Sequence, residues 1–148
     1  MEDQAKSAAL AILTKAADMT IATQRADGYP QATTVSFVND GLTIYFGTGA
    51  QSQKAANIAR SDKVSVTVNC PYRSWDDIKG LSLGGIARRL TDVAEMQRVG
   101  KLMFDKFPQI GNFVTPDAGE LAIFAITPIA MSLLDYSKGF GHTEPVRV

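Results

Sequence analysis

The segment Met19–Thr48, MTIATQRADGYPQATTVSFVNDGLTIYFGT, contains three short runs rich in β-branched and aromatic residues. The runs MTIATQR, QATTVSFV and LTIYFGT are separated by ADGYP and NDG, which place Asp and Gly where tight turns need them. Connections this short join antiparallel neighbours. The segment therefore predicts three consecutive strands in an antiparallel meander.

Further strands are expected along the rest of the chain. Lys63–Cys70 alternates valine with polar residues, which is the period of a strand with one buried face. Ile78–Asp92 is a longer strand, and its three glycines permit a bulge or a sharp bend. Residues 121–137 are interpreted as one strand or two, with Pro128 at an edge or a break. The glycine-rich tail 138–148 is expected to lie on the surface.

Three helices are predicted from apolar residues at spacings of three and four and from capping residues. They are placed in Ser7–Ala17, Ser52–Asp62 and Asp92–Phe107. Strands and helices do not alternate in the way that builds a parallel sheet. Residues 1–148 are therefore predicted to form a single, mainly β domain. Its architecture is a small antiparallel barrel of six to seven strands with about three helices packed outside.

The composition excludes several classes of function. Fifteen basic and fifteen acidic residues cancel without any block of like charge, so nucleic acid and anionic membranes are not expected as partners. A single cysteine and a single histidine leave no cluster with metal-ligand spacing. No apolar run approaches the length of a membrane span, and the acidic N-terminus is unlike a secretory signal. A soluble, cytoplasmic protein is the simplest expectation.

The stretch Gly47–Ile58, GTGAQSQKAANI, joins the third strand to the second helix. A helix N-terminus carries unpaired N–H groups and a partial positive charge, which suit a phosphate. Ser52 as the N-cap and Thr48 at the strand end could add hydroxyls, and Lys54 could balance a dianion. The same residues also suit an ordinary helix start. The local chemistry therefore leaves anion binding and a plain helix N-terminus open.

The order of these parts resembles the pyridoxamine 5′-phosphate oxidase-like family of FMN-binding split barrels. A DGYP turn precedes the strand TTVS, and Thr48, Ser52, Lys54 and Asn57 follow the family's T-x-x-x-S-x-K-x-x-N segment. The resemblance runs from about Met19 to Asp92, and more loosely to the C-terminus. It implies the split-barrel fold, an FMN cofactor, and a homodimer with two flavin sites at the interface between its chains.

The resemblance also implies site residues. The isoalloxazine ring and ribityl chain would be lined by Thr33, Thr34, Val35 and Ser36. The phosphate end would be held by Gly47, Thr48, Ser52, Gln53 and Lys54, with Asn57 completing the motif. Trp75, in the loop YRSWDD, is the aromatic residue expected to reach toward the pocket, although a loop tryptophan is more often a packing residue.

The sequence departs from the family's namesake at two charges. Thr33 and Gln53 stand where the oxidase has arginines, so FMN binding is expected to be weaker unless Arg88, Arg89 or a partner chain substitutes. The leading hypothesis is an FMN-dependent oxidoreductase acting on a small molecule, with no catalytic side chain identified. The alternatives are a flavin-binding stress or carrier protein without turnover and a deazaflavin (F420)-dependent reductase. The reductase would need a basic groove that Arg60 and residues 86–92 could supply.

Overall fold

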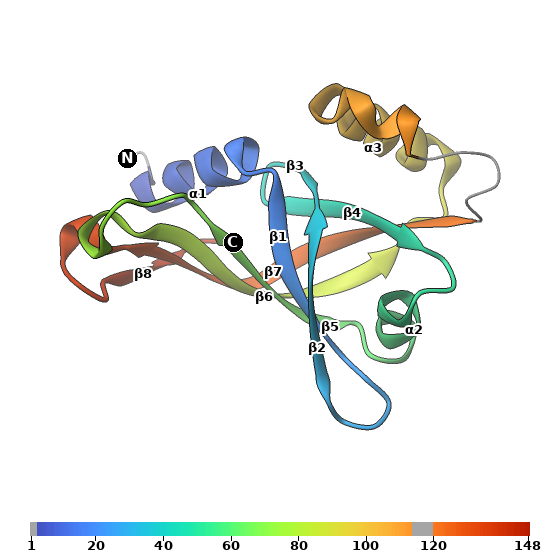
Figure 1. Cartoon of the computed structure of the whole chain (residues 1–148), viewed down its shortest axis with the longest axis horizontal. Coiled ribbons are helices and arrows are strands. Elements are labelled where there is room, and N and C mark those ends of the chain that lie inside the picture. Colours follow the sequence, from blue (N-terminus) through green and yellow to red (C-terminus); the bar gives the residue numbers. More distant parts are fainter. Residues whose placement is uncertain (1–2, 114–119) are drawn as a thin grey trace.

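The computed structural model describes residues 3–113 and 120–148 as helices packed on one curled antiparallel sheet (Figure 1). The strands are β1 Asp18–Gln24, β2 Pro30–Ser36, β3 Val38–Asp40, β4 Thr43–Gly49, β5 Lys63–Asn69, β6 Lys79–Arg89, β7 Leu121–Asp135 and β8 Thr143–Val146. The α-helices are α1 Gln4–Lys15, α2 Gln53–Arg60 and α3 Val93–Lys106. The predicted mainly β, antiparallel class is confirmed. The described residues form more strands than expected because β3 and β8 are too short to be recognised from their patterns.

The strands follow the order β2-β1-β5-β6-β7-β4-β3, and β8 pairs with the second half of β7. The predicted meander is correct for β1 and β2 but wrong at its next connection, because β4 pairs with β7 and not with β2. Phe37 and Val38 explain the difference: both are buried, and they belong to two separate core clusters. The chain therefore leaves the first hairpin at Phe37, and the sheet closes only part of a barrel.

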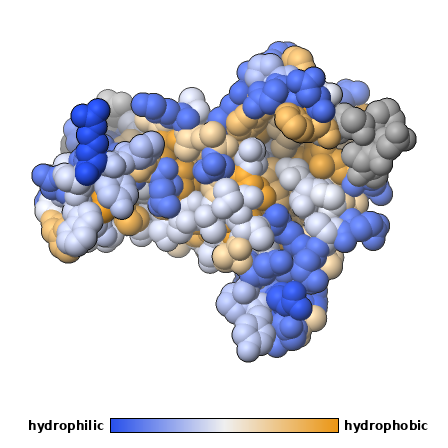
Figure 2. All heavy atoms as spheres, viewed as in Figure 1, coloured by the Kyte–Doolittle hydropathy of each residue, from blue (hydrophilic) through white to orange (hydrophobic). Residues whose placement is uncertain are grey.

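Two hydrophobic clusters hold the helices on the sheet. The larger contains Ile12 and Leu13 of α1, Ile58 of α2 and the inward residues of β1, β4, β5, β6 and β7. The smaller joins Val99 and Met103 of α3 to β3, β4 and β7, and Figure 2 shows hydrophobic atoms gathered beneath that helix. Both faces of the sheet are thus covered where β4 runs, which fixes the strand that leads into α2.

The predicted bend in the long strand is confirmed as a shift of register between Gly84 and Gly85. Gly85 lies opposite Pro128, which has no N–H to give to the ladder, and β7 passes through this proline as one continuous strand. A Cβ added at Gly85 would lie 2.7 Å from the Thr127 carbonyl oxygen, whereas one at Gly84 would approach only the Val64 oxygen, at 4.0 Å. The bulge therefore needs glycine at only one of the two positions.

These neighbouring glycines give a matched test of the bulge. We expect Gly85→Ala to lower the free energy of unfolding by about 1 to 3 kcal/mol, because backbone must move to relieve the clash. Gly84→Ala should change it by less than about 0.5 kcal/mol. Urea denaturation followed by circular dichroism measures both. Equal effects of the two substitutions would show that the register shift lies elsewhere.

The tail differs from the expectation of a surface segment. Residues 143–146 form β8, which pairs with Met131–Leu134 of β7, and Val146 is buried in the larger cluster. Asp135, at the end of β7, holds the connection: its carboxylate accepts hydrogen bonds from the Ser137 hydroxyl at 2.6 Å and from the Ser137 N–H at 3.2 Å. These bonds lower the pKa of Asp135. The sequence of this tail shows no strand pattern because only the four residues of β8 pair with β7.

Candidate cofactor-binding site

The junction between β4 and α2 brings two hydroxyl groups together at a helix N-terminus. Ser52 is the N-cap, and its Oγ accepts a hydrogen bond from the Ala55 N–H at 3.2 Å. The Thr48 Oγ1, from the end of β4, lies 3.1 Å from the Ser52 Oγ. No acidic side chain occupies the first turn of α2, where carboxylates are usually favoured. The predicted juxtaposition of Thr48 and Ser52 is therefore present, at a helix N-terminus whose first turn has no acidic residue.

Lys54 adds an unbalanced charge to this helix start. Its side chain is half-buried, and burial lowers the pKa of the ammonium below 10.5. Within residues 3–113 and 120–148, no carboxylate lies within ion-pair distance of Lys54. A cation in a first helical turn is also disfavoured by the helix dipole. A bound anion would relieve both costs.

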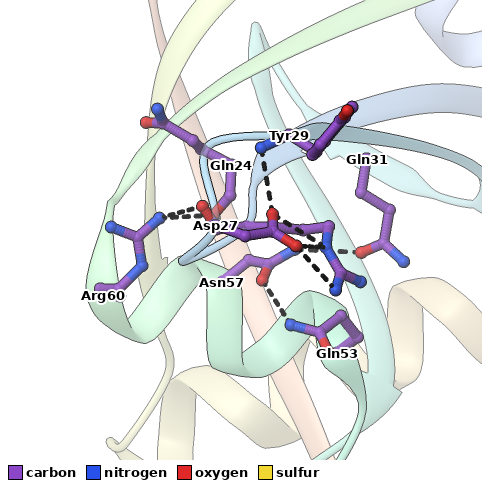
Figure 3. Close-up of polar contacts among 8 residues, drawn as sticks. Gln24, Asp27, Tyr29, Gln31, Gln53, Asn57 and Arg60 are labelled. Atoms are coloured by element: carbon purple, nitrogen blue, oxygen red, sulfur yellow. Dashed lines mark hydrogen bonds and ion pairs between the residues drawn. The ribbon is translucent and has the colours of Figure 1, made fainter.

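Asn57 anchors the helix to the β1–β2 hairpin (Figure 3). Its side chain is 2% exposed and donates to the Thr23 Oγ1 and to the Gln31 Oε1, each at 3.0 Å. It also accepts from the Gln53 Nε2 at 2.8 Å. Asn57 therefore holds α2 against the hairpin. Gln53 donates its side-chain hydrogen bond to Asn57 within the same helix.

A second contact, also visible in Figure 3, ties the end of α2 to the same hairpin. The Arg60 guanidinium donates to the carbonyl oxygens of Gln24 and Arg25 at 2.9 and 2.7 Å. A hydrogen bond within the turn stabilises the segment that follows: the Asp27 carboxylate accepts it from the Tyr29 N–H at 3.1 Å. The DGYP segment is thus a structural turn, and it fixes where β2 begins.

The strand predicted to face the ring is an edge strand. β2 pairs only with β1, so its other edge has no strand partner in the described chain. Thr33 and Val35 are partly buried on one face, whereas Thr34 and Ser36 are exposed on the other. The four side chains therefore cannot all contact one face of a ring. The Thr33 Oγ1 is buried and has no hydrogen-bond partner among the described residues, so its hydrogen-bonding capacity is unused within the described chain.

Ser36 and Gly47 come together in a cavity of about 180 Å³ between β2, β4 and the α3 side of the sheet. The rest of its lining is apolar: Phe37, Met103, Phe107, Ile110 and Leu121. These wall residues are not among those predicted from the sequence. Met103 belongs to the apolar stripe of the third helix and Leu121 to a predicted strand, and such patterns indicate burial without identifying the surface that the residue packs against.

Trp75 lies away from this junction, whereas Arg89 lines a cavity of about 260 Å³ together with Gln51, Ser52 and Ala55 of the junction. Trp75 is 69% exposed, and its ring lies 5.8 Å from that of Phe140. The β5–β6 connection that carries it is at the opposite end of the sheet from α2 (Figure 1). Arg88 pairs with Glu95 at 2.9 Å and Arg89 with Glu120 at 3.2 Å. The described part of the chain therefore does not bring the tryptophan to the junction, and the arginine that lies there is engaged with Glu120.

Neither a metal-binding cluster nor a membrane-spanning helix is found among the described residues. They contain no group of three or more His, Cys, Asp or Glu side chains placed to hold a metal ion. Among their helices, none has the length and apolarity to cross a membrane.

Comparisons with known proteins place the chain among relatives of one enzyme. The sequence profile of pyridoxamine 5′-phosphate oxidase matches residues 5–135. No curated protein matches this sequence. Similar solved structures include a heme-binding protein from Mycobacterium smegmatis, with a TM-score of 0.82 and 17% identity over 99% of this chain. The chain spans 59% of the length of that protein.

Two further structures have the same fold at similar lengths. A pyridoxamine 5′-phosphate oxidase-like protein from Listeria innocua has a TM-score of 0.70 and 23% identity, over 88% of this chain and 98% of its own. An F420 reductase has a TM-score of 0.64 and 23% identity, with the same coverage of 88% and 98%. At these identities the similarity establishes the fold only.

Proposed function

Because the chain belongs to the pyridoxamine 5′-phosphate oxidase family, we propose that it is a homodimeric, FMN-binding oxidoreductase acting on a small molecule. The observation that carries the proposal is the half-buried Lys54, without a carboxylate partner in the described chain, in the first turn of a helix whose start holds two adjacent hydroxyls. A phosphate monoester supplies the charge and the acceptor oxygens that this arrangement lacks.

The residues of this chain would divide the work of holding FMN. Lys54, Ser52 and Thr48 would bind the phosphate, with Asn57 fixing the helix that presents them. The Thr33 hydroxyl and the unpaired edge of β2 would offer hydrogen bonds to the polar rim of the ring. Bound FMN would supply hydride and electron transfer, for which the protein provides position and electrostatics. The apolar cavity beside Ser36 and Gly47 would exclude water from one side of the ring.

The open face of the sheet supports a dimer. A hollow of about 490 Å³ crosses β1, β5, β6 and β7, and it is lined by small uncharged side chains that include Thr20, Ser65, Thr67, Ser82 and Ser132. An exposed sheet face normally carries polar and charged side chains, whereas this one would let a second chain approach closely. A second chain could also bring its Trp75 to this chain's junction, which the Trp75 of the same chain does not approach.

Two alternatives use the same junction. A flavin carrier without turnover is favoured by the cavity beside Ser36, because none of the described residues that line it can titrate. An F420-dependent reductase is less favoured, since Arg60, Arg88 and Arg89 are all engaged within the chain. Reduction of the bound flavin by NAD(P)H, followed by reoxidation by a substrate, would distinguish the oxidoreductase from the carrier.

The direct test is a fluorescence titration with FMN, with riboflavin as the ligand that lacks the phosphate. We expect FMN to bind at least tenfold more tightly than riboflavin, because the phosphate contributes charge-assisted hydrogen bonds. Trp75→Ala should weaken the binding of both ligands equally, since a stacked indole ring contacts the isoalloxazine and not the phosphate. Equal affinity for FMN and riboflavin would exclude the phosphate seat, and no binding of either would exclude the flavin.

A further inference from the structure

The cavity of about 180 Å³ beside Ser36 and Gly47 has room for a single ring. An apolar cavity of about 150 Å³ in another protein stays free of water and binds benzene. The isoalloxazine of a flavin has three fused rings, so it cannot enter a space of this size. The proposed function therefore uses the cavity only as a wall and leaves its interior unassigned.

The described lining of this cavity favours an uncharged, aromatic occupant. Phe37 and Phe107 supply two aromatic rings, and Met103 adds a thioether, which makes favourable contacts with aromatic rings. The Ser36 hydroxyl is the only polar side chain among the described lining residues. A charged group placed here would lose its hydration without gaining an ion-pair partner from them. Phe37 and Met103 are buried whereas Ser36 is exposed, so the cavity runs from the core toward the surface.

One cation lies against the aromatic wall, but its charge is engaged at the end of α1. The Lys106 Nζ lies 4.3 Å from the centroid of the Phe37 ring and 5.5 Å from that of Phe107. It donates a hydrogen bond to the Ala16 carbonyl oxygen at 2.6 Å, and Lys106 is not among the described lining residues. The cation–π contacts stabilise both rings in place. The aromatic wall is therefore formed before any ligand binds.

Gly47 keeps the cavity open without a conformational reason to be glycine. It pairs with Ile123 inside the β4–β7 ladder, where a glycine weakens the strand. Its φ is not positive, and a Cβ added there would lie 3.5 Å from the Leu121 side chain, which is an ordinary van der Waals contact. Leu121 also lines the cavity, so the missing methyl group leaves space in it. A strand glycine of this kind marks a place where a ligand approaches closely.

We propose that this cavity binds the substrate of the flavin site, and that the substrate is a small, uncharged compound with a single aromatic ring. Its identity as the substrate rests on the proposed function, whereas the binding of the ring rests on the cavity alone. The ring lies among Phe37, Met103 and Phe107, and the Ser36 hydroxyl bonds to a polar substituent near the surface. Burial supplies the affinity, at roughly 25 cal/mol for each Å² of apolar surface removed from water.

The test is a fluorine NMR titration of the flavin-free full chain with fluorobenzene as the probe. We expect saturable binding, with para-fluorobenzoate roughly tenfold weaker or more, because its carboxylate finds no ion-pair partner in the cavity. Fluorocyclohexane, which has no aromatic face, should bind about threefold more weakly. No binding of fluorobenzene, or equal affinity for para-fluorobenzoate, would overturn the proposal. Equal affinity for fluorocyclohexane would overturn the aromatic preference.

Two glycines of β4 give matched variants that locate the probe in the molecule. Gly47→Ala places a methyl group at the cavity and should weaken fluorobenzene binding at least fivefold. Gly49→Ala adds a Cβ that meets nothing within 4 Å in the described chain, outside the described lining, and should leave the affinity unchanged. Equal affinities of the parent protein and Gly47→Ala would place the probe elsewhere and contradict the proposal. Because the titration uses flavin-free protein, its failure is distinguishable from a failure to bind FMN.

Discussion

Replacing Lys54 with alanine is expected to weaken FMN binding by about 1.5 to 3 kcal/mol, which is roughly a 10- to 150-fold rise in Kd. The reason is that Lys54 would make a partly buried, charge-assisted bond to the phosphate. The variant should keep the fold, because the side chain forms no described ion pair or hydrogen bond that the apo protein would lose. Riboflavin, which has no phosphate, should bind the variant and the parent protein equally. Unchanged FMN affinity would mean that the junction is only a helix start.

The pH dependence of FMN binding gives the same lysine a second signature. Because burial lowers the pKa of Lys54 in the free protein, its ammonium loses its proton at a lower pH than an exposed lysine would. The charged form is the one that binds a phosphate dianion, so affinity should fall as pH rises through this lowered pKa. Lys54→Arg keeps a charge that does not titrate in this range and should remove the fall. Parallel pH profiles for the two proteins would assign the titration to another group.

Asn57→Ala is expected to lower the free energy of unfolding by about 2 to 4 kcal/mol, the largest stability effect at the site. Asn57 donates two hydrogen bonds and accepts one, and its partner Thr23 is 3% exposed. Removing the amide leaves the Thr23 hydroxyl buried without its donor. Urea denaturation measures the loss as a lower midpoint at an unchanged slope.

Two further variants make this measurement specific. Gln53→Ala removes only an exposed partner of Asn57 and should cost less than about 0.5 kcal/mol. The double variant Thr23→Val with Asn57→Leu replaces both buried partners by apolar groups and should recover part of the loss. A midpoint of Asn57→Ala equal to that of the parent protein would show that the network contributes nothing to stability.

The helix start at the candidate site was predictable because it is local in sequence. Thr48 lies near the end of a strand, four residues before the N-cap Ser52, and Lys54 is in the first turn of the same helix, so the contact between the two hydroxyls follows from helix capping. The sequence also predicts Asn57 as a cofactor-binding residue, and in the structure its side chain donates to Thr23 and Gln31 of a hairpin more than twenty residues away in the chain. A motif position does not say whether a side chain faces a ligand or the protein interior.

The sequence by itself determined the class of fold, the three helices, the first hairpin and the glycine bulge, because each follows from hydrophobic period, capping or turn chemistry over a few residues. Only the tertiary structure decided that β4 leaves β2 to pair with β7, that the tail returns as β8, and that Met103 and Phe107 face Ser36. These depend on which distant surfaces bury one another. That choice is made by the packing of the whole core, as the separate burial of Phe37 and Val38 shows.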